Sequence, residues 1–334
     1  LMHISTNLSK KILAWYDNNK RILPWRVGKK SPNLLYYRLL SEFMLQQTQV
    51  KTVIPYFNNI TKKYKTLRSL SKCSEKEILK MWEGLGYYRR AKSLLATAKI
   101  LVKDYKLKLP KSLKEIKKLP GIGEYTGNAL LGLVYNEPTI AVDGNVKRVF
   151  ARNLNMQENK INFGQLINLN RNSFFNTKRN SDFVEALMEF GALMCKPKDP
   201  KCDICCLKNS CKYFKSSKKI KIKRKRNIKD KDFDILCYIN KNKQIALTKK
   251  IQVSFLKNFN LPRIQESNSL LNDKDWKFLK NYKSSVSNLK MNINLYYKFS
   301  NKIPAQYNWY SLDQNEDFIP SFTKKIFRQV TTLF

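Results

Sequence analysis

Four cysteines in one short segment constrain this chain more than any other feature of its sequence. They follow the spacing Cys195-x6-Cys202-x2-Cys205-x5-Cys211, and a fifth cysteine, Cys206, stands beside one of them. Thiolates this close together suit a single compact site in a loop, which could hold zinc or a [4Fe–4S] cluster. The spacing alone does not decide between the two. The total of seven cysteines is odd, which argues against a disulfide framework and for a reducing compartment.

The charge balance predicts a polyanionic partner. The 334 residues include 65 Lys and Arg against 25 Asp and Glu, which gives a formal net charge of +40. An excess of this size favours nucleic acid as the partner, although a compositional bias toward Lys and Asn can account for part of it. Residues 215–231 are especially rich in Lys and Arg. We interpret them as a linker that is either simply solvated or in contact with phosphates.

Several classes of protein and of chemistry are excluded. No apolar run approaches the roughly 20 residues that a membrane helix needs, and the first residues lack the features of a secretory signal. The single histidine, His3, excludes most Ser-His-Asp and Cys-His mechanisms and most histidine-ligated metal sites. Acid–base chemistry would therefore use carboxylates, Lys, Tyr or Cys. We expect a cytoplasmic protein without membrane contact.

The spacing of apolar residues divides the chain into two domains of different class. Helical spacing dominates before residue 215, with short loops that contain Pro or Gly. Later, strand-like runs occupy 233–239, 244–248 and 291–296, and residues 321–332 have the pattern of a closing helix. We therefore expect a mostly α domain over 1–214, a basic linker over 215–231 and a smaller α+β domain over 232–334.

A glycine-containing connection lies between two helical patterns, residues 113–118 and 126–134. Its sequence is LPGIG, in which Gly121 and Gly123 allow a tight turn and a close approach of the backbone to a ligand. The second helix would then direct its N-terminal amides at a phosphate. An ordinary helix connector is the alternative. Twenty residues beyond Gly123 lies Asp143, in a sequence typical of a helix N-cap.

Together, the LPGIG hairpin, the following aspartate and the four-cysteine loop resemble the helix–hairpin–helix DNA glycosylase superfamily. The resemblance covers residues 8–214 nearly continuously. It implies a two-lobed, mostly α glycosylase domain and a [4Fe–4S] cluster in the loop at 195–211. The cluster ligands would be Cys195, Cys202, Cys205 and Cys211, and Cys206 would be a bystander.

Four further motifs are similar to those of one branch of this superfamily, the adenine glycosylases or MutY enzymes. They are SEFMLQQTQV at 41–50, LPWR at 23–26, GLGYY at 84–88 and VDGNVKRV at 142–149. The branch that cleaves the DNA strand has a catalytic lysine just after the hairpin, where this chain has Tyr125. The resemblance therefore implies a monofunctional enzyme without a Schiff-base nucleophile.

The same branch carries a C-terminal domain that resembles a Nudix fold and reads the base opposite adenine. Leu261-Pro262 and Tyr307 to Tyr310 fit that domain, and residues 286–288 align with its Phe-Ser-His lesion loop, of which only Ser287 remains. The metal-binding Nudix box is absent. The resemblance thus implies lesion recognition by residues 232–334, not nucleotide hydrolysis.

The roles of two carboxyl groups follow from this resemblance together with their surroundings. Glu42 lies on an apolar helix, where burial would raise its pKa, and its family role is to protonate N7 of adenine. Asp143 lies at a helix start, which favours its ionised form, and its family role is to stabilise the oxocarbenium-like sugar. Tyr125 and Asn145 would orient the pair by hydrogen bonding.

Adenine inside a duplex is out of reach, so the enzyme would flip it out of the stack. Gln46, Gln47 and Tyr87 are candidates to fill the gap, and Trp25, Arg26 and Glu185 match pocket positions of the family. Packing between helices is an equally good interpretation of Trp25. We expect a monomer that acts on double-stranded DNA containing adenine opposite 8-oxoguanine or guanine. The other expected contacts with DNA or the base are Leu45, Thr48, Gly121, Gly123 and Ser287.

Two other functions compete with this one. The first is a thymine or uracil mismatch glycosylase on the same scaffold, against which Glu42 and the QQTQ run argue. The second is a basic DNA-binding module that has a structural cluster but no activity. The pairing of Glu42 with Asp143 argues against it.

Overall fold

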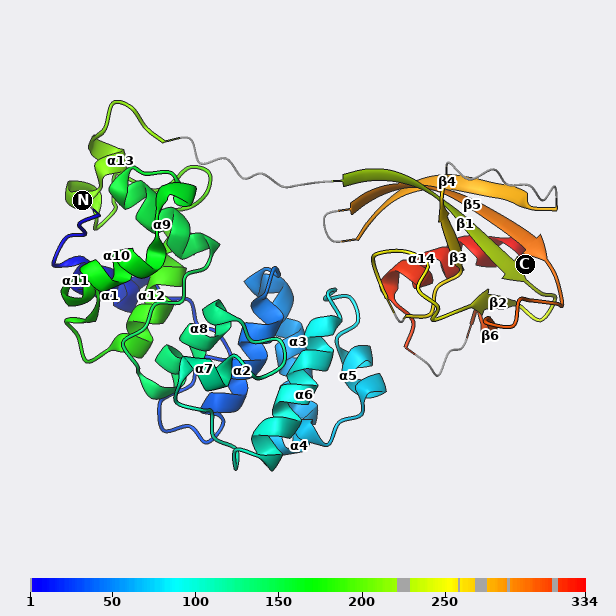
Figure 1. Ribbon diagram of the computed structural model, residues 1–334, viewed down its shortest axis with the longest axis horizontal. Coiled ribbons are helices and arrows are strands. Elements are labelled where there is room, and N and C mark those ends of the chain that lie inside the picture. Colours follow the sequence, from blue (N-terminus) through cyan, green and yellow to red (C-terminus); the bar gives the residue numbers. More distant parts are fainter. Residues whose placement is uncertain (1, 221–228, 258, 268–274, 287–288, 314–317) are drawn as a thin grey trace. The chain divides into compact units, whose positions relative to one another are not determined.

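The computed structural model describes residues 2–220, 229–257, 259–267, 275–286, 289–313 and 318–334. The chain divides into two compact units (Figure 1). The first consists of Leu1–Met81 and Tyr88–Lys223 and is helical, and the second consists of Trp82–Tyr87 and Arg224–Phe334 and is built on a sheet. None of the helices in the described ranges combines the length and the apolar character that a bilayer span requires.

The helical unit contains α-helices throughout, with short 3-10 turns at Glu158–Lys160 and Lys208–Ser210. In Figure 1, α1 and α9 to α13 lie together in one group, and α2 to α8 form another. In chain order the helices are α1 (Leu8–Asn19), α2 (Leu34–Leu45), α3 (Val50–Lys63), α4 (Leu67–Ser71), α5 (Glu75–Met81), α6 (Arg89–Lys103), α7 (Leu113–Ile116), α8 (Glu124–Tyr135), α9 (Gly144–Leu154), α10 (Phe163–Leu169), α11 (Arg171–Phe175), α12 (Asn180–Leu193) and α13 (Lys212–Lys215).

Helix α2 is the most deeply buried helix near the predicted site. Its sequence, LLYYRLLSEFML, is apolar on nearly every side, and nine of its 12 residues are buried. A helix that is hydrophobic all round has to lie in the interior. Consequently its polar residues, Arg38, Ser41 and Glu42, are carried into the core along with the apolar ones.

The predicted hairpin connects α7 to α8. Gly121 has a φ of +76°, and a Cβ atom there would lie 2.6 Å from Cβ of Ser93 and 2.8 Å from Cε1 of Phe43. Only glycine fits, because both the backbone conformation and the space exclude a side chain. Gly123 is the N-cap residue of α8, and a Cβ atom there would meet nothing within 4 Å.

The second unit is a six-stranded sheet covered by one helix. The strand order is β4-β5-β1-β2-β6, with β3 paired to β1; β1 and β5 run parallel, and all the other pairs are antiparallel. The apolar face of α14 (Ser321–Val330), which includes Phe322, Ile326 and Val330, packs on the sheet in a core of its own (Figure 1). The strands are β1 (Lys229–Ile239), β2 (Gln244–Leu247), β3 (Arg263–Glu266), β4 (Lys277–Val286), β5 (Leu289–Phe299) and β6 (Asn308–Ser311).

The strands and the closing helix predicted for this unit are confirmed, and their boundaries differ by a few residues. Strands occupy 233–239, 244–247 and 291–296, and a helix closes the chain, as the sequence indicated. Strand β1, however, begins at Lys229, inside the segment that we expected to be linker. Residues 229–231 pair with 289–291 of β5 while their side chains stay exposed. Backbone pairing with a long neighbour therefore extends this strand beyond its apolar part.

Candidate active site

Glu42 lies in the interior of the helical unit. Glu42 is only 5% exposed, and burial raises the pKa of its carboxyl group to about 7. The hydroxyl group of Tyr125, on α8, donates a hydrogen bond to Oε2 of Glu42 over 3.2 Å. This bond and the charge of Arg38 act against the rise, while the charges of Asp143 and Glu185 add to it. Near neutral pH a substantial fraction of Glu42 therefore carries a proton.

Asp143 is the N-cap residue of α9. Its Oδ1 accepts a hydrogen bond from the backbone N–H of Val146 at 2.7 Å, and its Oδ2 accepts one from Nδ2 of Asn145 at 2.8 Å. These bonds lower the pKa of Asp143, as expected for a carboxylate at a helix start. Burial acts in the opposite direction and outweighs them, so the pKa lies above its ordinary value. The side chain is nevertheless held by both oxygens in one orientation.

Asn145 connects this carboxylate to Arg148, which sequence reasoning missed. Oδ1 of Asn145 accepts a hydrogen bond from Nη2 of Arg148 at 2.8 Å. The same guanidinium donates to the backbone oxygen of Cys195 at 2.9 Å and to that of Gly191 at 2.6 Å. A continuous line of hydrogen bonds therefore joins Asp143 to the loop of the predicted cluster ligands. The available sequence signal was the place of Arg148 in the VDGNVKRV motif, five residues after Asp143.

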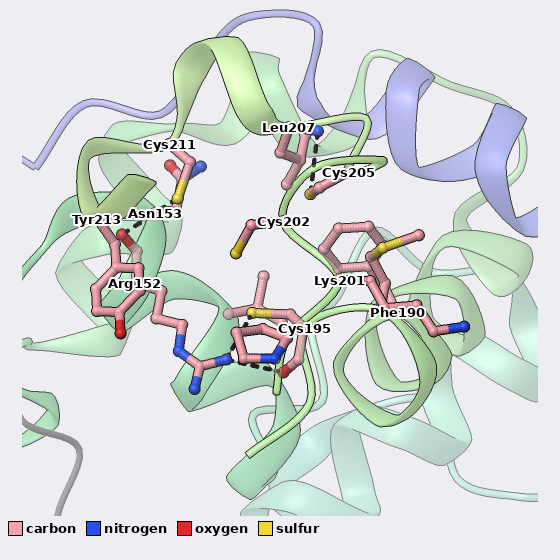
Figure 2. Close-up of a pocket in the computed structure, with 13 residues that line it drawn as sticks. Arg152, Asn153, Phe190, Cys195, Lys201, Cys202, Cys205, Leu207, Cys211 and Tyr213 are labelled. Atoms are coloured by element: carbon pink, nitrogen blue, oxygen red, sulfur yellow. Dashed lines mark hydrogen bonds between the residues drawn. The ribbon is translucent and has the colours of Figure 1, made fainter. Parts of the chain in front are cut away.

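Figure 2 shows the four predicted cysteine ligands around one pocket. Cys195, Cys202, Cys205 and Cys211 all line it, together with apolar residues such as Phe190, whereas Cys206 is not among the lining residues. Nη1 of Arg152 lies 3.4 Å from Sγ of Cys195, and the backbone N–H of Leu207 lies 3.4 Å from Sγ of Cys205. Within the described residues, no three His, Cys, Asp or Glu side chains form a group that could hold one metal ion.

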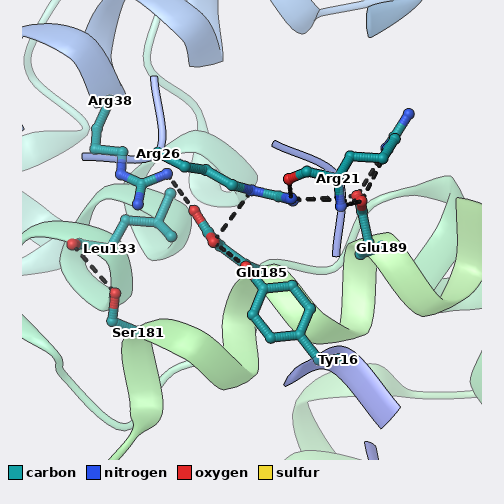
Figure 3. Close-up of polar contacts among 8 residues, drawn as sticks. All are labelled: Tyr16, Arg21, Arg26, Arg38, Leu133, Ser181, Glu185 and Glu189. Carbon is teal, nitrogen blue, oxygen red and sulfur yellow. Dashed lines mark hydrogen bonds and ion pairs between the residues drawn. The ribbon is translucent and has the colours of Figure 1, made fainter. Parts of the chain in front are cut away.

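A buried network of charges lies beside the site (Figure 3). The carboxylate of Glu185, on α12, accepts hydrogen bonds from Tyr16 and Arg38 and lies 3.2 Å from Nε of Arg26. One turn further along α12, Glu189 pairs with Arg21 at 2.7 Å and with Arg26 at 3.1 Å. Sequence reasoning singled out Arg26 and Glu185 but missed the others. The position of Arg38, four residues before Glu42, was the available signal.

Two of the predicted gap-filling residues are exposed and have left-handed backbone conformations. Gln47 has a φ of 57°, and Tyr87, which is 41% exposed, has a φ of 49°. Non-glycine residues rarely adopt such values away from turns and functional sites. Gln46 is half-buried at the end of α2, and its backbone oxygen accepts a hydrogen bond from Arg90.

The remaining predicted contacts lie in different settings. Trp25 is 4% exposed and packs edge-on against Phe57, with ring centroids 5.4 Å apart, as the packing interpretation expects. Leu45, the last residue of α2, and Thr48, in the loop that follows, are half-buried. Ser287 lies outside the described residues.

Comparison with known proteins gives a consistent result. A family model described as HhH-GPD superfamily base excision DNA repair protein matches residues 40–165. An adenine DNA glycosylase of Buchnera aphidicola subsp. Baizongia pistaciae is 36% identical over 340 residues, which cover 96% of this chain and 95% of that protein. The adenine DNA glycosylase of Schizosaccharomyces pombe is 36% identical over 233 residues, 64% of this chain and 50% of that protein.

Solved structures resemble part of the chain. A thermostable thymine-DNA glycosylase superimposes with a TM-score of 0.55 and 29% identity and covers 62% of this chain and 94% of its own. Endonuclease III, in a trapped covalent intermediate with DNA, gives a TM-score of 0.51 and 19% identity over 64% of this chain and 98% of its own. The second likeness concerns the fold alone.

Proposed function

The chain belongs to the adenine DNA glycosylases, enzymes of base-excision repair, and we propose that its substrate is adenine paired with 8-oxoguanine or guanine in duplex DNA. The observation that carries the proposal is the pair of carboxyl groups, each held by a hydrogen-bonding neighbour: Glu42 by Tyr125 and Asp143 by Asn145. Cleaving a glycosidic bond takes one carboxyl group as acid and one carboxylate to stabilise the sugar.

In the proposed mechanism, Glu42 donates its proton to N7 of the flipped adenine. The bond between N9 and C1′ then breaks, and its electron pair leaves with the protonated base. Asp143 stabilises the positive charge that develops at C1′, and water adds there and loses a proton. The pKa of about 7 for Glu42 supports the acid role, because the proton is available at neutral pH yet can be given up.

The residue after the hairpin supports a monofunctional reaction. Tyr125 lies beside Glu42 and carries a hydroxyl group, not an amine. No imine can therefore form there with the opened sugar. We propose that the enzyme releases the base and leaves the strand intact at the abasic site.

The four cysteines suit a [4Fe–4S] cluster. Cys195, Cys202, Cys205 and Cys211 line one pocket between α9, the end of α12 and α13, with the guanidinium of Arg152 close to one sulfur atom. Four cysteines arranged around one cavity suit a multi-iron group, whose separate iron atoms each take a thiolate, better than they suit a single metal ion. When bound, such a group would supply structural cross-linking of this loop, since metal binding and folding are coupled. No step of the reaction runs through it.

The exposed backbone at the start of α8 and the exposed side chains of Gln47 and Tyr87 support the proposed DNA contacts. The amides at the start of α8, around Gly123, are open to a phosphate, and Gln46, Gln47 and Tyr87 would fill the gap left by adenine. Trp25 would border the base pocket from within the core. We further propose that the enzyme acts as a monomer on the nucleoid.

The second unit would read the opposite base. Residues 232–334 provide a sheet and a covering helix, an arrangement compatible with a Nudix-like domain. We propose that this unit, with Ser287 as one contact, distinguishes 8-oxoguanine from guanine. We keep the domain boundaries near the predicted 1–214, 215–231 and 232–334, with the helical unit extended to residue 220 and the second unit beginning with β1 at Lys229.

A panel of mispaired duplexes tests the proposed function. Duplexes with adenine opposite 8-oxoguanine, adenine opposite guanine, thymine opposite guanine and uracil opposite guanine are incubated with enzyme in excess, and strand breaks are developed with alkali. We expect breaks only at adenine, and faster opposite 8-oxoguanine. Breaks at thymine or uracil in place of adenine would favour the competing mismatch activity, a reading that the likeness to a thymine-DNA glycosylase makes worth testing.

A further inference from the structure

The carboxylate of Glu185 is occupied by three partners within the protein. A side chain whose task was to bind the flipped adenine would have fewer such partners. Its side chain is 9% exposed. Its two oxygens accept hydrogen bonds from Tyr16 on α1 and Arg38 on α2, and they form an ion pair with Arg26 from the segment before α2 (Figure 3). Tyr16 also lies under the guanidinium of Arg26, 5.5 Å from its ring centroid. This carboxylate therefore holds three groups together in the interior.

Arg38 is the partner that matters for the reaction, because it lies one helical turn before Glu42. Residues four apart on a helix are neighbours and readily form ion pairs. The Arg38 side chain is 7% exposed, one of its nitrogens is bound by Glu185, and its Nε has no hydrogen-bond partner within the described residues. Two buried carboxyl groups interact with this guanidinium: Glu185 binds it directly, and its charge lowers the pKa of Glu42.

The charged and polar groups that act on Glu42 lie on α2, α8 and α12 and at the N-cap of α9, and Arg90 binds the backbone just after Glu42. On α2 itself there is Arg38, Tyr125 comes from α8, Asp143 from the N-cap of α9 and Glu185 from α12. Arg90, on α6, donates hydrogen bonds to the backbone oxygens of Phe43 and Met44 at 3.2 and 2.8 Å. Arg38 and Glu185 act on the pKa of Glu42 in opposite directions, and the effect of Arg38 is the larger of the two.

We propose that Glu185 is a positioning residue for the acid: it holds the guanidinium of Arg38 away from Glu42 and so preserves the proton on Glu42. This proposal rests on the acid role proposed for Glu42. Removing the charge of Glu185 leaves a buried cation without its partner, which is costly. The nearest remedy is for Arg38 to pair with Glu42, which would then lose its proton and its use as an acid.

The first test is the pH profile of Glu185→Gln under single-turnover conditions on an adenine:8-oxoguanine duplex. The rate constant of the unaltered enzyme falls as the pH rises through the pKa of Glu42. In the variant this limb moves to lower pH by about one unit or more, so the deficit is about tenfold at pH 8 and small at pH 5.5. Glu189→Gln is the matched control, because it removes a neighbouring carboxylate of α12 that pairs with Arg21 and Arg26, and its limb stays in place.

The second test removes the guanidinium of Arg38 together with the carboxylate of Glu185. In the double variant Arg38→Met/Glu185→Gln no guanidinium remains to pair with Glu42, and the limb returns to the pH of the unaltered enzyme or above it. Arg38→Met alone moves the limb upward. If Glu185 instead contacts the base, Glu185→Gln lowers the rate equally at every pH and the double variant rescues nothing, which overturns the proposal.

A titration of Glu42 that does not depend on enzyme activity tests this proposal separately from the proposed function. Protein labelled with 13C at the glutamate carboxyl carbons gives a titrating NMR signal for Glu42, assigned by its loss in Glu42→Gln. A lower midpoint in Glu185→Gln, restored in the double variant, supports the proposal even if Glu42 proves not to be the acid. An unchanged midpoint in Glu185→Gln contradicts it whatever the enzyme excises.

Discussion

Among single residues, Glu42 sets how the proposed activity depends on pH. Burial raises its pKa to about 7, and only the protonated form can act as an acid. The single-turnover rate of adenine release is therefore expected to fall about tenfold per pH unit above that value. Rates measured between pH 5.5 and 9 check this. A profile that stays flat through pH 8.5 would show that no such acid limits the reaction.

The same burial should cost stability at neutral pH. The pKa of Glu42 is about 7 in the folded protein against 4.5 ordinarily, so between these values the folded state binds more protons than the unfolded state. Stability contributed by this group is present below pH 4.5 and is lost as the pH rises to about 7. Glu42→Gln should therefore be the more stable protein at pH 8, by the order of 3 kcal/mol, and this advantage should shrink toward pH 4.5. Thermal unfolding at both pH values measures the difference.

Tyr125 determines what remains on the DNA after the base has left. Because its hydroxyl group, not an amine, faces Glu42, no covalent imine is expected. Borohydride added during the reaction should trap almost no protein–DNA adduct, and strands should break only after alkali. Efficient trapping at the rate of base release would identify another amine at the sugar and contradict the monofunctional proposal.

At the scale of elements, the close approach of α9 to α12 holds Asp143, the proposed catalytic aspartate, in place. A Cβ atom on Gly191 would lie 2.7 Å from Cβ of Asn145 and 3.0 Å from its backbone oxygen, so the start of α9 would have to move. Gly191→Ala should lower stability by about 1–3 kcal/mol and slow base release. Gly164→Ala on α10 is the control, since its nearest neighbour would be 3.5 Å away. Equal stability of both variants would show that this close approach is not required.

Elements whose apolar pattern matches their burial could be predicted from the sequence. The helices that flank the hairpin, the apolar part of β1 and the closing helix belong to this group. Strand β4 could not, because Lys277–Val286 mixes three lysines and other polar residues with apolar ones and shows no regular alternation. It lies at the edge of the sheet and owes its conformation to pairing with β5. Arg38 was missed for a related reason. Its partner Glu185 is distant in sequence, and only the packing of α2 near α12 brings them together.

At the scale of the whole molecule, the two units have separate cores and should have separate tasks. The helical unit is best cut after residue 220, because Asn155 binds the backbone of Lys218 and Ile220. A 1–220 fragment should keep base release but lose about tenfold or more of its preference for 8-oxoguanine over guanine. Single-turnover rates on both duplexes decide this. An unchanged preference would place lesion recognition in the helical unit.

Release of free adenine by the unaltered enzyme and by Glu42→Gln, with affinity measured in parallel, tests the central claim most directly. On an adenine:8-oxoguanine duplex, Glu42→Gln should lose at least about a hundredfold in the rate of release, because it keeps the shape of Glu42 without its acidic proton. Its affinity for the duplex should stay within a few-fold of the unaltered enzyme. Release at the unaltered rate by Glu42→Gln would contradict the assignment of Glu42 as the acid and with it the proposed mechanism.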